Sequence, residues 1–131
     1  MTTFEVVSRD RVEMIDITAE VRQAIADSGI RSGICILFTP HTTAAITINE
    51  NADPDVVRDL VMELNKLVPF EDNYRHLEGN SAAHLKSSLV GAGETLIIED
   101  GRPQLGTWQG IWFCEFDGPR RRHVQLQILD R

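Results

Sequence analysis

The order of polar and apolar residues divides the first third of the chain into short strands and one helix. Residues 4–8 and 12–17 alternate in part, and the polar stretch SRDR between them predicts a hairpin-like start. Residues 18–28 place apolar side chains on one helical face and stop at Gly29, which predicts a helix with a glycine end. The apolar run GICILF that follows has the length of a buried strand.

From His41 onward, polar and apolar positions alternate again, so a strand in this segment would bury one face. The apolar face holds Ala44, Ile46 and Ile48. The opposite face is a row of mostly small polar residues headed by an imidazole: His41, Thr43, Ala45, Thr47 and Asn49. That row is either an ordinary exposed strand surface or one wall of a functional site.

Two further helices are predicted on either side of an aperiodic loop. Asp53 followed by proline is a typical N-cap, and residues 54–67 repeat apolar side chains at helical spacing. Residues 68–79 have no period and contain many polar side chains, which predicts a loop. Residues 80–90 favour a short helix whose inward side chains would be Ala82, Leu85 and Leu89.

The last third of the chain predicts three strands, in the runs ETLIIE, GIWFCEFD and RHVQLQIL. In the final run, Val124, Leu126 and Ile128 would face inward, which leaves His123 on the surface. Periodicity therefore indicates a mixed chain with at least six strands and two or three helices.

Composition and charge narrow the class of protein. A chain of 131 residues is large enough for one domain with a single core, without disulfide or metal support. The net charge of −7 argues against a nucleic-acid partner, and no apolar run approaches a membrane span, so we expect a cytoplasmic protein. Cys35 and Cys114 lie in apolar runs without basic neighbours and are expected to be inert, buried thiols.

Three histidines stand in segments that do not resemble core sequence. His41, His76 and His84 are surrounded by Asn, Asp, Glu, Thr and Ser. Because an imidazole can ligate a metal, move a proton or bind an anion, these segments predict one site assembled from loops and element ends.

Three other residues have two interpretations each. Glu115 interrupts an apolar run, so it is either a hydrogen-bonded structural carboxylate or a site acid. Lys86 is either exposed or a phosphate contact, and Trp108, in the run LGTWQGI, either stacks on a ligand or packs in the core or an interface.

Three runs together resemble the YjbQ-like family, whose members are known as secondary thiamine-phosphate synthase enzymes. They are HTTAAITINENAD, EGNSAAHLKSSLVG and LGTWQGIWFCEFDGPRRR, and the likeness spans residues 4–129. The family commonly has an aspartate where Glu78 stands and a histidine where Ala82 stands. His84 and Lys86 are the parts of that run that carry over.

The resemblance implies an α+β domain of mostly antiparallel, sandwich-like sheets that assembles as a homotrimer, with a polar site near the subunit boundary. It also implies a reaction in which a thiazole phosphate displaces pyrophosphate from hydroxymethylpyrimidine diphosphate. For such a small phosphorylated heteroaromatic substrate, we expect catalytic roles for His41, His76, His84 and Glu115. We expect substrate contacts from Arg75, Asn80, Lys86, Thr107, Trp108 and Gln109. The three histidines are also the expected ligands of a divalent metal, Zn or Mg.

Two other functions use the same residues. One is a non-catalytic trimeric protein that binds a metal or a small anion, and the other is a hydrolase in which a histidine-bound metal activates water. The spacing does not separate them, because His76 and His84 are eight positions apart and match no short zinc motif.

Overall fold

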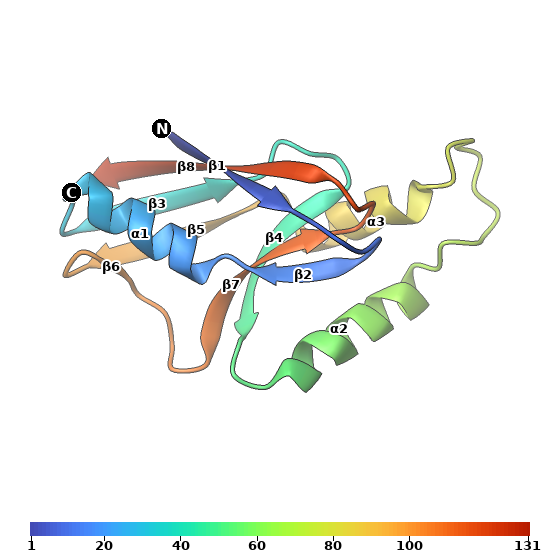
Figure 1. Ribbon diagram of the computed structural model, residues 1–131, viewed down its shortest axis with the longest axis horizontal. Helices are drawn as coiled ribbons and strands as arrows, with labels where there is room; N and C mark the ends of the chain where they lie inside the picture. Colours follow the sequence, from blue (N-terminus) through green and yellow to red (C-terminus); the bar gives the residue numbers. More distant parts are fainter.

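Two antiparallel sheets enclose the core, and three helices flank them (Figure 1). The structure is a computed structural model that describes residues 1–131. Sheet A has the order β1 (Thr2–Val7), β8 (Arg121–Asp130), β3 (Gly33–Phe38), β5 (Gly93–Glu99) and β6 (Arg102–Pro103). Sheet B has the order β2 (Glu13–Asp16), β7 (Gln109–Glu115) and β4 (Ala44–Glu50). The helices are α1 (Thr18–Ser28), α2 (Pro54–Leu67) and α3 (Ser81–Val90), and the predicted α+β fold is confirmed.

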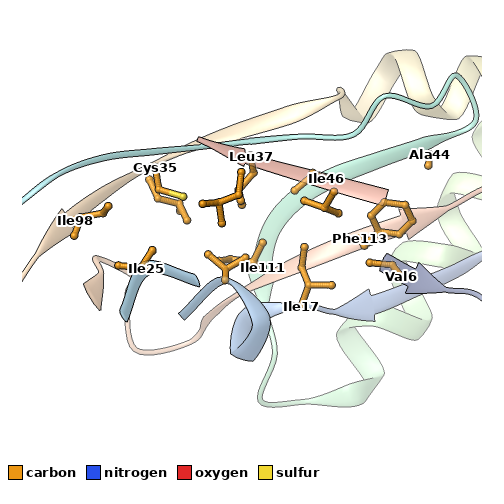
Figure 2. Packing of buried hydrophobic residues seen from close by; sticks show 14 residues of the cluster. Val6, Ile17, Ile25, Cys35, Leu37, Ala44, Ile46, Ile98, Ile111 and Phe113 are labelled. Carbon is orange, nitrogen blue, oxygen red and sulfur yellow. The ribbon is translucent and has the colours of Figure 1, made fainter. Parts of the chain in front are cut away.

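The main core lies between the inner faces of the two sheets and α1 (Figure 2). Val124 and Leu126 of β8 face into it as the alternation predicts, and Phe113 of β7 meets them from sheet B. Val21 and Ile25 of α1 are fully buried in the same cluster.

The ends of α1 and α2 agree with the local signals in the sequence. Gly29 closes α1 with φ of 71°, a left-handed conformation that glycine adopts without a side-chain clash. The Asp53 carboxylate accepts a hydrogen bond from the Asp55 amide at 2.9 Å at the start of α2. No helix combines the length and the apolar character that crossing a bilayer requires.

The prediction of a hairpin at the start of the chain is wrong. β1 pairs with β8 in sheet A, whereas β2 pairs with β7 in sheet B. The segment between them bonds elsewhere: the Ser8 amide donates to the Arg120 carbonyl, and the Arg9 amide donates to the Glu13 carboxylate. The connection therefore carries the chain from one sheet to the other.

The predicted inward face of α3 is correct for Ala82 and wrong for the two leucines. Leu85 and Leu89 are exposed, and the buried face consists of Ala82, Ala83, Lys86 and Ser87. Small side chains let this helix lie close to sheet B, where Ser87 Oγ donates to the Ala44 carbonyl at 2.7 Å. As a result α3 covers Ala45, so at this position the row on β4 is neither exposed surface nor pocket wall.

Sheet A leaves an apolar outer face uncovered. The run GICILF buries only alternate residues, because β3 has a core on one side alone. Large side chains exposed on the outer face are Ile34, Ile36, Phe38, Ile97 and Leu129. The amphipathic α2 likewise has no fully buried residue.

Candidate functional site

The structure places all three predicted histidines on one pocket of about 430 Å³, at the end of the molecule where β7 passes into β8. Three chain segments and the first turns of α3 form its walls, and none of its lining residues is hydrophobic. We call it the histidine pocket; it is lined by Pro40, His41, Thr42, Thr43, His76, Glu78, Asn80, His84, Asp117, Arg120 and Arg122.

Arg122 is the most strongly held cation of the histidine pocket. Its guanidinium is buried, with Nε donating to Glu115 Oε1 at 2.9 Å and Nη2 donating to Thr43 Oγ1 at 2.8 Å. Glu115 belongs to sheet B and Arg122 to sheet A, so the ion pair joins the two sheets. An arginine held on two sides has its remaining nitrogen, Nη1, oriented in advance for a contact with an anion.

Glu115 lies behind this arginine and does not line the pocket. Ser8 Oγ donates to its Oε1 at 2.7 Å and the Asp117 amide donates to its Oε2 at 3.0 Å. Burial alone would raise the pKa of Glu115, but the hydrogen bonds from Arg122, Ser8 and Asp117 outweigh it and lower the pKa. Of its two interpretations, the geometry favours the structural carboxylate, which positions Arg122.

His41 makes a hydrogen bond that fixes its protonation state. Its Nε2 accepts from the backbone amide of His123 at 2.9 Å, and the two rings stack with centroids 6.2 Å apart. Burial, followed by the charge of Arg122, lowers the pKa of His41. A neutral ring that accepts at Nε2 carries its proton on Nδ1, so the nitrogen left for a ligand is a donor.

His76 and His84 form a second pair. Their rings are perpendicular with centroids 5.7 Å apart, and Nε2 of His76 lies 3.8 Å from the Glu78 carboxylate. His84 projects from the first turn of α3, whereas His76 and Glu78 come from the loop before it. His76 and Glu78 are exposed, whereas His84 is half-buried.

Asn80 occupies the N-cap position of α3 and faces the pocket. Its Nδ2 donates to Asp117 Oδ2 at 2.9 Å, while its buried Oδ1 has no hydrogen-bond partner. Arg120 Nη2 contacts the same Asp117 carboxylate at 3.2 Å. The pocket therefore lies at the amino end of a helix, where the backbone amides of the first turn favour an anion.

Lys86 lies outside the pocket, and the expectation of an exposed lysine is wrong. Its side chain is fully buried, and Nζ has no hydrogen-bond partner. Nζ lies 3.8 Å from the centre of the Phe70 ring, and the Arg11 guanidinium lies 3.6 Å from the same centre. Burial, with a smaller effect from Arg11, lowers the pKa of Lys86 to about 8.

The remaining predicted substrate contacts lie elsewhere in the chain. Thr107, Trp108 and Gln109 are exposed at the start of β7, which is about 20 Å from its pocket end at a rise of about 3.3 Å per residue. Gln109 Oε1 accepts from the Gly106 amide and so stabilises its own loop. Arg75 lines a neighbouring hollow instead of the histidine pocket.

The donor geometry does not provide a complete metal site within one chain. No three His, Cys, Asp or Glu side chains are arranged to hold an ion, and Nε2 of His41 is bonded to an amide. His76 and His84 are the two imidazoles near enough to share one. Burial raises the pKa of Cys35 to about 11 and of Cys114 to about 12, which keeps both thiols protonated and inert, as expected.

Residues 2–131 match the family model described as UPF0047 protein YjbQ-like. The chain belongs to the YjbQ/UPF0047 family. It is 53% identical to a UPF0047 protein of Methanocaldococcus jannaschii over 96% of this chain and 91% of that one. It is also 52% identical to the UPF0047 protein YugU of Bacillus subtilis over 98% of each.

Solved structures of YjbQ/UPF0047 proteins have the same fold. A Clostridium acetobutylicum protein matches with a TM-score of 0.97 and 50% identity, over 98% of this chain and all of that one. A Sulfolobus solfataricus protein, described as of unknown function, matches with a TM-score of 0.95 and 33% identity, over 99% and 96%. These relatives establish the family and the fold.

Sequence reasoning missed Arg120, Arg122 and Asp117 as pocket residues of this YjbQ/UPF0047 protein. A signal for Arg122 was present, because it continues the inward-facing series of Val124 and Leu126. A cation on an inward face requires a buried partner, and Glu115 was the one carboxylate in an apolar run.

Proposed function

We propose that the histidine pocket binds the phosphate groups of a small phosphorylated molecule, and that the protein is a transferase of thiamine-phosphate synthase type. In that reaction a thiazole nitrogen attacks the methylene carbon of hydroxymethylpyrimidine diphosphate. A carbon–nitrogen bond forms, the carbon–oxygen bond breaks, and pyrophosphate leaves with the electron pair. The site must therefore stabilise a strongly anionic leaving group.

The observation that carries the proposal is the orientation of Arg122 toward an entirely polar pocket. Nε and Nη2 are bonded to Glu115 and Thr43, which leaves Nη1 for a ligand. Arg120 and the amino end of α3 add further donors at the same pocket. Nδ1 of His41 is a further hydrogen-bond donor. The pocket wall therefore offers several donors suited to phosphate oxygens.

His76 and His84 supply the groups for proton transfer. Both line a pocket that has no hydrophobic residue in its wall. Neither ring nitrogen of His84 is hydrogen-bonded to a protein atom. A free imidazole beside a bound diphosphate can donate a proton to the departing oxygen. His84 is the better placed of the two, because it is attached to a helix and half-buried.

The test is pyrophosphate release from the two thiamine precursors. His84→Ala should lower the rate by a factor on the order of 10². His123→Ala is the matched control, because His123 does not line the pocket and the substitution removes only its ring stacking on His41, while the hydrogen bond from its backbone amide is retained. If His84→Ala turns over at the parent rate, the proposed role of His84 is wrong. If the parent protein shows no turnover, the synthase assignment is wrong.

One observation favours a simpler function, in which the pocket binds a phosphorylated molecule or small anion without a reaction. Trp108, the residue expected to stack on the heteroaromatic ring, lies at the far end of β7. Binding of inorganic pyrophosphate to the parent protein, measured by calorimetry, together with absent turnover would support this alternative.

We also propose that the protein is a homotrimer that holds a divalent metal. The uncovered face of sheet A and the incompletely buried α2 support an assembly, because a second copy would remove both from water. A metal would need a ligand besides His76 and His84, and it would supply positive charge for the leaving group. Elemental analysis of untagged protein purified without chelator tests the metal.

A further inference from the structure

A second hollow adjoins the histidine pocket, and the two share His76 and His84 as a common wall. It has a volume of about 420 Å³ and is lined by Tyr74, Arg75, His76, Ser81, His84 and Leu85. It therefore lies along the outer side of the first turn of α3, next to the helix start that faces the histidine pocket.

The two hollows differ in chemistry. The histidine pocket has no hydrophobic lining residue, whereas Tyr74 and Leu85 give the second hollow an aromatic and an aliphatic wall. The Tyr74 hydroxyl donates to the Pro69 carbonyl, so its hydrogen bond is made within the protein and the ring remains for contact. The Leu85 side chain is exposed on a helix whose other face packs on sheet B, which leaves it available to a ligand.

We infer that the two hollows together bind one phosphate ester, with the phosphate in the histidine pocket and a flat apolar group between Tyr74 and Leu85. The inference rests on the proposed phosphate binding and adds the place and the chemistry of the organic group. The bond that joins the two parts passes His76 and His84, whose perpendicular rings stand 5.7 Å apart between the hollows. Tyr74 and Leu85 thus take the ring-binding role that the sequence suggested for Trp108.

The residues that line the second hollow indicate which kind of organic group fits there. Arg75 lines the second hollow, so a cation stands beside the bound ring as well as beside the phosphate. The Tyr74 ring and the Leu85 side chain offer apolar contacts that a planar ring uses more fully than a sugar does. The class of ligand is therefore an aryl or heteroaryl phosphate.

Calorimetry with three probes tests the inference: inorganic pyrophosphate, methyl phosphate and phenyl phosphate. The parent protein should bind phenyl phosphate about tenfold more tightly than methyl phosphate, which corresponds to the burial of part of one ring. Leu85→Ser should abolish that preference and leave methyl phosphate and pyrophosphate unchanged. Leu89→Ser, an exposed leucine of the same helix outside the hollow, should keep the preference.

The outcomes separate this inference from the proposed function. Equal affinity for the two esters, or an undiminished preference in folded Leu85→Ser, overturns the assignment of the second hollow while phosphate binding stands. Failure of all three probes to bind overturns both. Circular dichroism of each variant establishes that the fold persists.

Discussion

Arg122 of β8 and Glu115 of β7 form an ion pair across the two sheets, with both side chains almost entirely removed from water. Neutral hydrogen bonds from Ser8 and to Thr43 support the two charges, but each charge is compensated by the other, and loss of either one leaves its partner buried and uncompensated. The stability of the fold and the shape of the pocket therefore both depend on this ion pair.

Glu115→Gln should lower the free energy of unfolding at neutral pH by about 3–5 kcal/mol. The pKa of Glu115 is lowered in the folded protein, so its contribution is complete above the ordinary value of 4.5 and is lost as pH falls through the folded pKa. Urea unfolding at several pH values measures both effects. Glu5→Gln, an exposed position on β1, is the control, and an equal loss there would contradict the argument.

The pKa of His41 should lie below 6.5, the ordinary value for histidine, and the neutral ring should carry its proton on Nδ1. The unfolded chain binds a proton at higher pH than the folded one, so stability should decrease as pH falls through 6.5. Nitrogen-15 NMR of the imidazole reports the tautomer and the titration. A proton found on Nε2 at neutral pH would show that the bond to the His123 amide is absent.

Lys86→Met should stabilise the protein, because it removes a buried ammonium without a hydrogen-bond partner and keeps the volume of the side chain. In the parent, the pKa of about 8 lies below the ordinary value of 10.5. Between these values the unfolded state binds more protons, so stability should rise with pH by up to about 1.4 kcal/mol per unit. The Met variant should lack this rise in urea unfolding.

The control for that experiment is Lys66→Met, since Lys66 is exposed and bonded only to Glu63. It should keep the pH dependence of the parent. A Lys86→Met variant that is less stable than the parent at every pH would mean that the contact with Phe70 outweighs the cost of burial.

The parent protein should have three times the 14.7 kDa chain mass by light scattering at micromolar concentration. Phe38→Glu should reduce the assembly to monomers, because it places a charge in the apolar outer face of sheet A. Ala19→Glu on the exposed side of α1 should leave the mass unchanged. A monomeric parent would overturn the proposed trimer, and a Phe38→Glu trimer would place its interface elsewhere.

The parts of the fold that the sequence predicted are those with local causes. The glycine stop of α1 and the Asp53 cap of α2 act within a few residues, so their signals are complete in a short window. The partner of β1 and the buried face of α3 depend on residues far along the chain. No pattern in a single segment contains that information, and the two-residue β6 has no pattern at all.

The candidate site, like the fold, was predictable only where the signal lies in a short stretch of sequence. His41, His76 and His84 were recognised because their polar neighbours exclude a core role, and they do line one pocket. Trp108 was grouped with them because the sequence does not reveal which end of β7 faces the histidines. The burial of Lys86 could not be read from α3, since it depends on Phe70 from the preceding loop.

The position of β8 has a consequence for how the protein is made. This strand follows all the others along the chain, yet it lies between β1 and β3 in sheet A. On the ribosome, Val6 of β1 therefore emerges 116 residues before Arg122, its partner in β8. Until β8 is synthesised, sheet A lacks the strand that joins β1 to β3, and the pocket lacks Arg122. The binding site can therefore form only once nearly the whole domain has left the exit tunnel.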